Sequence, residues 1–260
     1  MRIIDRYAYN NRLTKVGPAY KFGLAVLVIA LCLVLNEIWV GVLVVGWMFY
    51  LGVYHAGLPA RTFGRLLIAE GSFLLLTSVG VAVSVSVGPS PLPWQMVIGP
   101  LTFSSSPEAL ALMLLLLTRA LGATAAMNFL ALTTPLMDIL VVLRRLRVPE
   151  TLIDVMVVMY RFIFVLLDTL ERMVTAQGSR LGYQTGYWRS MQNAGQLGAR
   201  LFLNAMARSQ RLETAVSARG FNNNLTVLQP TYQPFPRFTV WLVAITATLL
   251  LAKGGTLWLS

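Results

Sequence analysis

The sequence predicts an all-α integral membrane protein with about five transmembrane helices, a sixth being left open, and long amphipathic helices on the cytosolic side. Hydrophobic residues make up 57% of the 260 residues and charged residues only 12%, which is too apolar for a soluble domain of this length. Five strongly apolar runs follow one another along the chain. Between the fourth and the fifth, residues 134–237 hold twelve of the twenty-one Lys and Arg residues against six acids. These observations divide the chain into 1–133, 134–237 and 238–260.

We expect the amino-terminal segment to be a retained cytosolic tail. It has no small-residue cleavage site, and charged residues precede the first apolar run: Arg2, Asp5, Arg6, Arg12, Lys15 and Lys21. The first two runs, 20–36 and 38–54, are separated only by Asn36-Glu37. One helix through both would be roughly 50 Å long and would leave Glu37 in lipid. We therefore expect two helices that turn at the outer surface.

The third span is expected over 66–88, with Glu70 one turn inside it and paired with a nearby arginine. Residues 83–87 alternate like a strand. Because five residues cannot form a closed barrel, and lipid admits only helices or barrels, the span is favoured over the local pattern. Residues 89–108 contain five prolines and no Lys or Arg, which predicts an extended loop on the outer side.

The fourth span, 109–132, contains one arginine in its middle, Arg119, followed by several small residues. Small residues let another helix approach closely, and an arginine at that depth should face protein or trapped water. Arg119 is either a buried contact to a partner or a structural anchor, and both interpretations stay open. The last span is expected over 238–258, after Pro230, Pro234 and Pro236.

Three helices are predicted within 134–237. Thr134-Pro135 offers a capping residue and a proline for the start of the first helix, which should end near Pro149. The second, 150–177, has one charged face, formed by Asp154, Arg161, Asp168 and Arg172. Its remaining surface is apolar, which leaves a sixth span open. The third, 191–219, has a polar face with steps of three or four: Arg200, Asn204, Arg208, Arg211, Ala215 and Arg219. Such amphipathic helices are typical of a membrane surface or of contact with a membrane-embedded partner.

Both long helices end in small residues around an arginine, at Ser179-Arg180-Leu181-Gly182 and at Ala218-Arg219-Gly220. A glycine just past the last turn can take the left-handed conformation that closes a helix. The arginine then complements the partial negative charge of the helix end. For either motif alone, an ordinary helix end is the better interpretation, whereas two such ends on two amphipathic helices of one region favour a functional role.

Together with three further segments, these motifs resemble the transmembrane coupling component of energy-coupling factor transporters, in the CbiQ type of the cobalt and nickel uptake branch. The further segments are Leu132-Thr133-Thr134-Pro135, Leu143-Arg144-Arg145-Leu146-Arg147-Val148-Pro149 and Tyr160-Arg161-Phe162. The resemblance implies a non-catalytic subunit that joins two ATP-binding cassette ATPases to a CbiM-like substrate-binding membrane protein. It assigns ATPase coupling to Ser179, Arg180, Gly182, Ala218, Arg219 and Gly220. The first motif departs from Ala-Arg-Gly, because Ser179 replaces the alanine and Leu181 precedes the glycine.

Other function classes find little support. The net charge of +11 could indicate nucleic-acid binding, but the basic residues flank apolar runs, as the positive-inside rule requires of a multi-pass protein of the inner membrane. One cysteine, Cys32, and one histidine, His55, cannot form a transition-metal site, so no metal or other cofactor is expected in this chain. No glycine-rich phosphate loop or hydrolase motif occurs. A permease subunit with its own path for nickel or a vitamin remains the alternative, and a membrane enzyme a lesser one.

Overall fold

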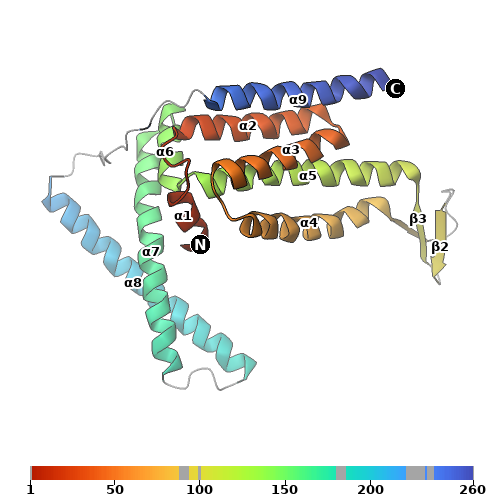
Figure 1. Cartoon of the computed structure of the whole chain (residues 1–260). Coiled ribbons are helices and arrows are strands. Elements are labelled where there is room, and N and C mark those ends of the chain that lie inside the picture. Colours follow the sequence, from red (N-terminus) through yellow and green to blue (C-terminus); the bar gives the residue numbers. More distant parts are fainter. Residues whose placement is uncertain are drawn as a thin grey trace. The chain divides into compact units, whose positions relative to one another are not determined.

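The computed structural model describes residues 2–87, 94–98, 101–179, 186–220, 232 and 237–259. The chain divides into two compact units (Figure 1). One comprises Met1–Val142 with Pro230–Ser260, and the other comprises Leu143–Gln229. We call them the membrane unit and the coupling unit and describe each by itself.

The membrane unit is a bundle of helices that run side by side (Figure 1). Its helices are α1 (Arg2–Tyr9), α2 (Pro18–Leu35), α3 (Ile38–Tyr50), a π-helical turn η1 (Leu51–His55), α4 (Ala60–Ala82), α5 (Pro107–Thr133) and α9 (Arg237–Leu259). Helix α5 is central, because α1, α2, α3 and α4 all pack against it, while α9 packs against α2 and α3. The prediction of a helical membrane protein is confirmed.

Among the described residues, four segments are long and apolar enough to cross a membrane. They are α2, the continuous stretch Ile38–His55, α4 and α5. In α9 the described apolar part, Phe238–Gly254, falls just short of that length, so the fifth span stays a prediction. Helix α7 (Glu150–Gly178), the candidate for a sixth span, is not among them.

Local chemistry explains where these helices begin and end. Pro107 is at the start of α5, and the Ser106 hydroxyl accepts a hydrogen bond from the Ala109 N–H at 3.1 Å, a side-chain cap. Helix α2 begins at Pro18 and ends before Asn36, which has a left-handed φ of 51°. The predicted turn between the first two spans is therefore confirmed at Asn36.

A small antiparallel sheet corrects the prediction for residues 83–108. Its strands are β1 (Ser84–Val87), β2 (Trp94–Ile98) and β3 (Leu101–Ser105), in the order β1-β3-β2. In the backbone register, Val85 of β1 and Met96 of β2 are each paired with Phe103 of β3. The expected continuation of the third span through residue 88 is wrong, because α4 ends at Ala82 and β3 supplies a partner strand. The exclusion of short strands from lipid does not apply to residues that follow the end of the helix.

The coupling unit is built on two long helices, α7 and α8 (Tyr187–Ala218). They follow α6 (Leu136–Arg145), whose last three residues belong to this unit. Arg147 takes a left-handed φ of 61°, and the expected end near Pro149 is confirmed. The expected cap at Thr134 is wrong. The carbonyl of Pro135 accepts the first N–H bonds of α6, and the Thr134 hydroxyl is buried with no hydrogen-bond partner in the described chain.

Candidate functional site

The two long helices of the coupling unit bury very little of their surface. Helix α8 has no buried residue, and in α7 only Ile153 and Asp154 are buried. Large apolar side chains are exposed on both helices: Leu152, Val155, Met156, Met159 and Ile163 on α7, and Tyr187, Trp188, Met191, Phe202, Leu203 and Met206 on α8. Contiguous exposed apolar surface typically marks a protein or membrane contact. The described part of this chain leaves these faces uncovered.

The start of α7 is tied to the end of α6 by an ion pair. Nη2 of Arg144 lies 3.9 Å from Oδ1 of Asp154. Nε of Arg144 is buried and has no hydrogen-bond partner among the described residues. Asp154, predicted as part of the charged face of its helix, is therefore largely covered, and its pairing is with the preceding helix.

Helices α7 and α8 contact each other near the end of the first and the start of the second. There the Gln177 amide donates to the carbonyl oxygen of Asn193 at 3.4 Å, a long hydrogen bond. The apolar side chains described above remain exposed beside this contact and are available to other molecules.

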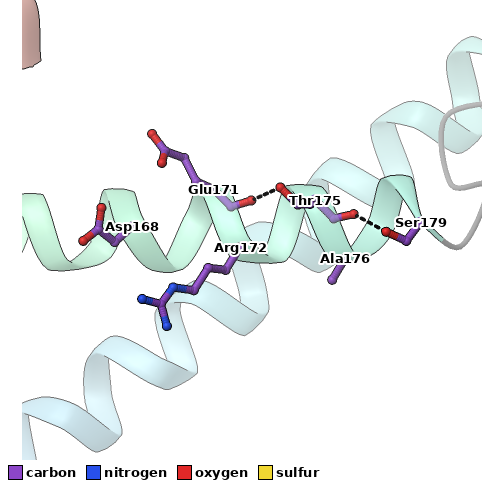
Figure 2. Close-up of a pocket in the computed structure, with 6 residues that line it drawn as sticks. All are labelled: Asp168, Glu171, Arg172, Thr175, Ala176 and Ser179. Carbon is purple, nitrogen blue, oxygen red and sulfur yellow. Dashed lines mark hydrogen bonds between the residues drawn. The ribbon is translucent and has the colours of Figure 1, made fainter.

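A hollow of about 600 Å³ opens on the last three turns of α7 (Figure 2). It is lined by Asp168, Glu171, Arg172, Thr175, Ala176 and Ser179. The Thr175 hydroxyl donates to the Glu171 carbonyl at 2.8 Å, and the Ser179 hydroxyl donates to the Thr175 carbonyl at 3.1 Å. Figure 2 shows Glu171 and Arg172 pointing to different sides of the helix. The hollow thus presents charges of both signs next to Ser179, the first residue of the predicted first motif.

The second predicted motif has a defined helix end. Arg219 follows the last residue of α8 and is exposed, and its N–H donates to the Val216 carbonyl at 3.1 Å. Gly220 has φ +74°, and a Cβ there would meet nothing within 4 Å. Glycine is therefore required by the backbone conformation and not by lack of space. Of the first motif, Ser179 closes α7, while Arg180 and Gly182 lie outside the described residues.

Arg119, the predicted intramembrane contact, has a partner within the chain. Its Nη1 donates to Oδ1 of Asn36 at 3.1 Å, and its carbonyl accepts the Cys32 thiol at 3.6 Å. Its Nε is buried and has no hydrogen-bond partner in the described chain. The side chain therefore links α5 to the turn between α2 and α3, and a contact with another subunit stays a prediction.

Two polar positions differ from the sequence prediction. Glu70 has Asn128 as its partner instead of an arginine, with Nδ2 of Asn128 donating to Oε2 at 2.7 Å. Lys21, assigned from the sequence to the cytosolic tail, is in the second turn of α2 and is fully buried. Only its position three residues after Pro18 could have suggested that it belongs to the helix.

No metal centre is apparent in the described residues, where no three His, Cys, Asp or Glu side chains converge. His55 lies against aromatic rings, with its ring centroid 3.8 Å from that of Trp241 and 5.4 Å from that of Tyr50. The imidazole of His55 thus contacts the last residue of α3 and a residue of α9.

Comparison with known proteins gives consistent results along the chain. The family described as CbiQ, cobalt transport protein, matches residues 12–230. An uncharacterised protein of Methanocaldococcus jannaschii is 27% identical over 253 residues, which cover 96% of this chain and 91% of the relative. The cobalt transport protein CbiQ of Rhodobacter capsulatus is 35% identical over 155 residues, covering 60% of this chain and 63% of the relative. A putative fused cobalt transport protein CbiMQ of Methanocorpusculum labreanum is 28% identical over 182 residues, 69% of this chain and 30% of the relative.

Proposed function

The chain belongs to the CbiQ family of cobalt transport proteins, and from that premise we propose that it is the membrane coupling subunit of an ATP-driven cobalt importer. In this proposal two ATP-binding cassette ATPases bind the coupling unit on the cytosolic side. A CbiM-like membrane protein recognises the substrate. The chain transmits the conformational change of the ATPases to that protein and catalyses no reaction itself.

The observation that carries the proposal is the exposure of α8. This helix has 32 residues and buries none of them, although Phe202 and Leu203 are 67% and 66% exposed. A helix with little tertiary support and a large apolar face is stabilised when a partner covers that face. A separate ATPase and a membrane subunit are two such partners.

The basic end of α8 suggests how force is transmitted. Arg219 places a planar guanidinium with five donors at the tip of a long helix, and Gly220 turns the chain away. A groove with carboxylates or carbonyl oxygens can hold that group at two points, whereas a lysine supplies one point charge. Arg180 would act in the same way at the end of α7.

Two observations support cobalt as the substrate and a separate subunit as the protein that recognises it. Cobalt prefers several imidazole or thiolate ligands, and this chain has one histidine and one cysteine. The name of the fused CbiMQ relative joins a CbiM part and a CbiQ part in one polypeptide, which supports a CbiM-like partner for this chain. A permease path within this chain has less support, because Glu70 is hydrogen-bonded to Asn128.

The test is to purify the tagged chain from its native membrane and to identify the proteins that accompany it. We expect two ATPase chains and a CbiM-like protein, with cobalt uptake that requires ATP. Arg219→Ala should weaken ATPase docking by roughly 2–5 kcal/mol or uncouple hydrolysis from uptake, and Arg219→Lys should recover part of the loss.

Arg189→Ala is the matched control, because this arginine is exposed near the other end of α8. It should leave assembly, hydrolysis and uptake unchanged. If Arg219 only completes the helix end, its loss should cost at most about 1 kcal/mol of local stability. Normal assembly, hydrolysis and uptake in the double variant Arg180→Ala, Arg219→Ala would end the coupling assignment.

A further inference from the structure

Lys21 has no exposed surface and lies at the connection between α5 and α6. Nζ of Lys21 donates to the carbonyl oxygen of Thr133 at 2.9 Å. The same oxygen accepts Nδ2 of Asn11 at 3.2 Å. Thr133 is the last residue of α5, so its carbonyl is one of those a helix end leaves without an intrahelical partner. Two buried donors from the amino-terminal part of the chain therefore close the central helix.

The network continues into the first turn of α6. Asp138 acts electrostatically on the Lys21 ammonium, and its Oδ1 accepts the hydroxyl of Tyr232 at 2.9 Å. We call Asn11, Lys21, Thr133, Asp138 and Tyr232 the junction. It joins four parts of the membrane unit: the loop after α1, helix α2, the α5–α6 connection and the segment before α9.

The position of the junction indicates its purpose. Helix α6 runs from the membrane unit into the coupling unit, the boundary falling after Val142. Along the chain, α6 and the segment that returns to α9 are the two covalent connections between the units. The junction holds the membrane end of both connections.

We propose that Lys21 is a positioning residue that fixes the α5–α6 elbow, so that movement of the coupling helices displaces the membrane helices instead of bending the connection. The proposal rests on the proposed coupling function. It adds to that function a residue distant from both arginine motifs and identifies the part of the membrane unit that receives the movement.

Stability alone does not call for a charge at Lys21. A buried ammonium carries a large desolvation cost, and apolar residues of similar volume are often as stable or more so. A methionine would fill the site, and Asn11 would still satisfy the Thr133 carbonyl. What the methionine cannot supply is the directional hydrogen bond from α2 to the end of α5, and the positive charge on which Asp138 acts.

The experiment compares Lys21→Met, Lys21→Arg and Tyr232→Phe with wild type in the complete assembly. Lys15→Met is the matched control, because Lys15 is exposed in the loop before α2. The measurements are the amount of assembled complex, ATP hydrolysis, cobalt uptake per ATP hydrolysed, and amide exchange over residues 136–142 of the full-length chain. The last measurement does not need the partners.

For Lys21→Met we expect normal assembly and normal ATP hydrolysis. Amide exchange in α6 should be faster by about ten-fold or more, because one hydrogen bond to a charged group is lost. Uptake per ATP should fall by a similar factor. Lys21→Arg should restore part of the coupling. Tyr232→Phe changes volume very little and should raise exchange by about five-fold, which keeps the test valid if Lys21→Met fails to accumulate.

Wild-type exchange in α6 or wild-type uptake per ATP in Lys21→Met would overturn the proposal. So would equal losses of assembly and uptake in Lys21→Met and Lys21→Arg, since that is the pattern of a role in folding alone. Absence of the ATPases from the wild-type complex would instead refute the proposed function, and the exchange measurement would still decide whether the junction holds α6.

Discussion

The side-chain amide of Asn128 on α5 donates a hydrogen bond to the carboxylate of Glu70 on α4, with Nδ2 and Oε2 separated by 2.7 Å. Both side chains are half-buried, and both helices are long and apolar enough to span a membrane. Polar groups at such positions are costly without a partner. The pair therefore helps to fix how α4 packs against the central helix.

Replacing Asn128 by leucine should destabilise the membrane unit. The carboxylate of Glu70 would lose its donor, which costs about 1–3 kcal/mol. In thermal unfolding of the full chain in detergent, Asn128→Leu should unfold at lower temperature, while Glu70→Leu with Asn128→Leu should recover most of the loss, because no polar group is then left without its partner. Additive losses in the double variant would show that the two residues are not coupled.

The crossing of α3 and α5 allows no side chain at Gly41. A Cβ there would lie 2.5 Å from the carbonyl oxygen of Thr118, whereas a Cβ at Gly46 on the same helix meets nothing within 4 Å. Gly41→Ala should therefore cost roughly 1–3 kcal/mol through overpacking, measured by the same unfolding assay. Gly46→Ala is the control and should be neutral or slightly stabilising. Equal effects of the two substitutions would contradict the close approach.

The end of α8 should depend on the backbone of Gly220. An alanine would have to adopt φ +74°, which costs about 1–2 kcal/mol for an L-residue. Gly198→Ala, inside α8 and with open space around it, should instead stabilise the helix by about 0.5–1 kcal/mol. Amide exchange over residues 214–220 measures both effects. Faster exchange in both variants, or in neither, would rule out the left-handed end.

The proposed orientation predicts opposite labelling of two serines. Ser105 ends β3, beside the loop without basic residues, and Ser190 is in the first turn of α8. In a Cys32→Ala background, Ser105→Cys should react with an impermeant thiol reagent applied outside the cell. Ser190→Cys should react only after the membrane is opened. Reaction of both from the outside would refute the topology.

The sequence predicted the bounds of the helices better than the contacts between residues far apart in the chain. Helix α7, predicted over 150–177, ends one residue later, and α8 begins four residues before the predicted start. Helices are held by hydrogen bonds between residues four apart, so apolar length, prolines and glycines within a segment largely determine them. The left-handed conformation of Gly220 was also predictable from neighbouring residues, because a glycine just past the last turn commonly closes a helix.

Pairing between distant residues was decided by the tertiary structure. Whether residues 84–87 form a strand depends on residues 101–105, which supply the paired strand. Likewise the partner of Glu70 depends on how α4 packs against α5, and the sequence alone led us to expect an arginine instead of Asn128. A donor and its acceptor 58 positions apart leave no local pattern that distinguishes one pairing from another.

By itself, then, the sequence determined a helical membrane protein with a basic helical region and the family to which it belongs, because length, apolarity and short motifs are properties of contiguous residues. Only the tertiary structure decided that Lys21 is buried against the end of α5. A basic residue near the start of a span can remain at the surface or turn into the bundle, and the choice depends on an acceptor, Thr133, that lies 112 residues away in the chain.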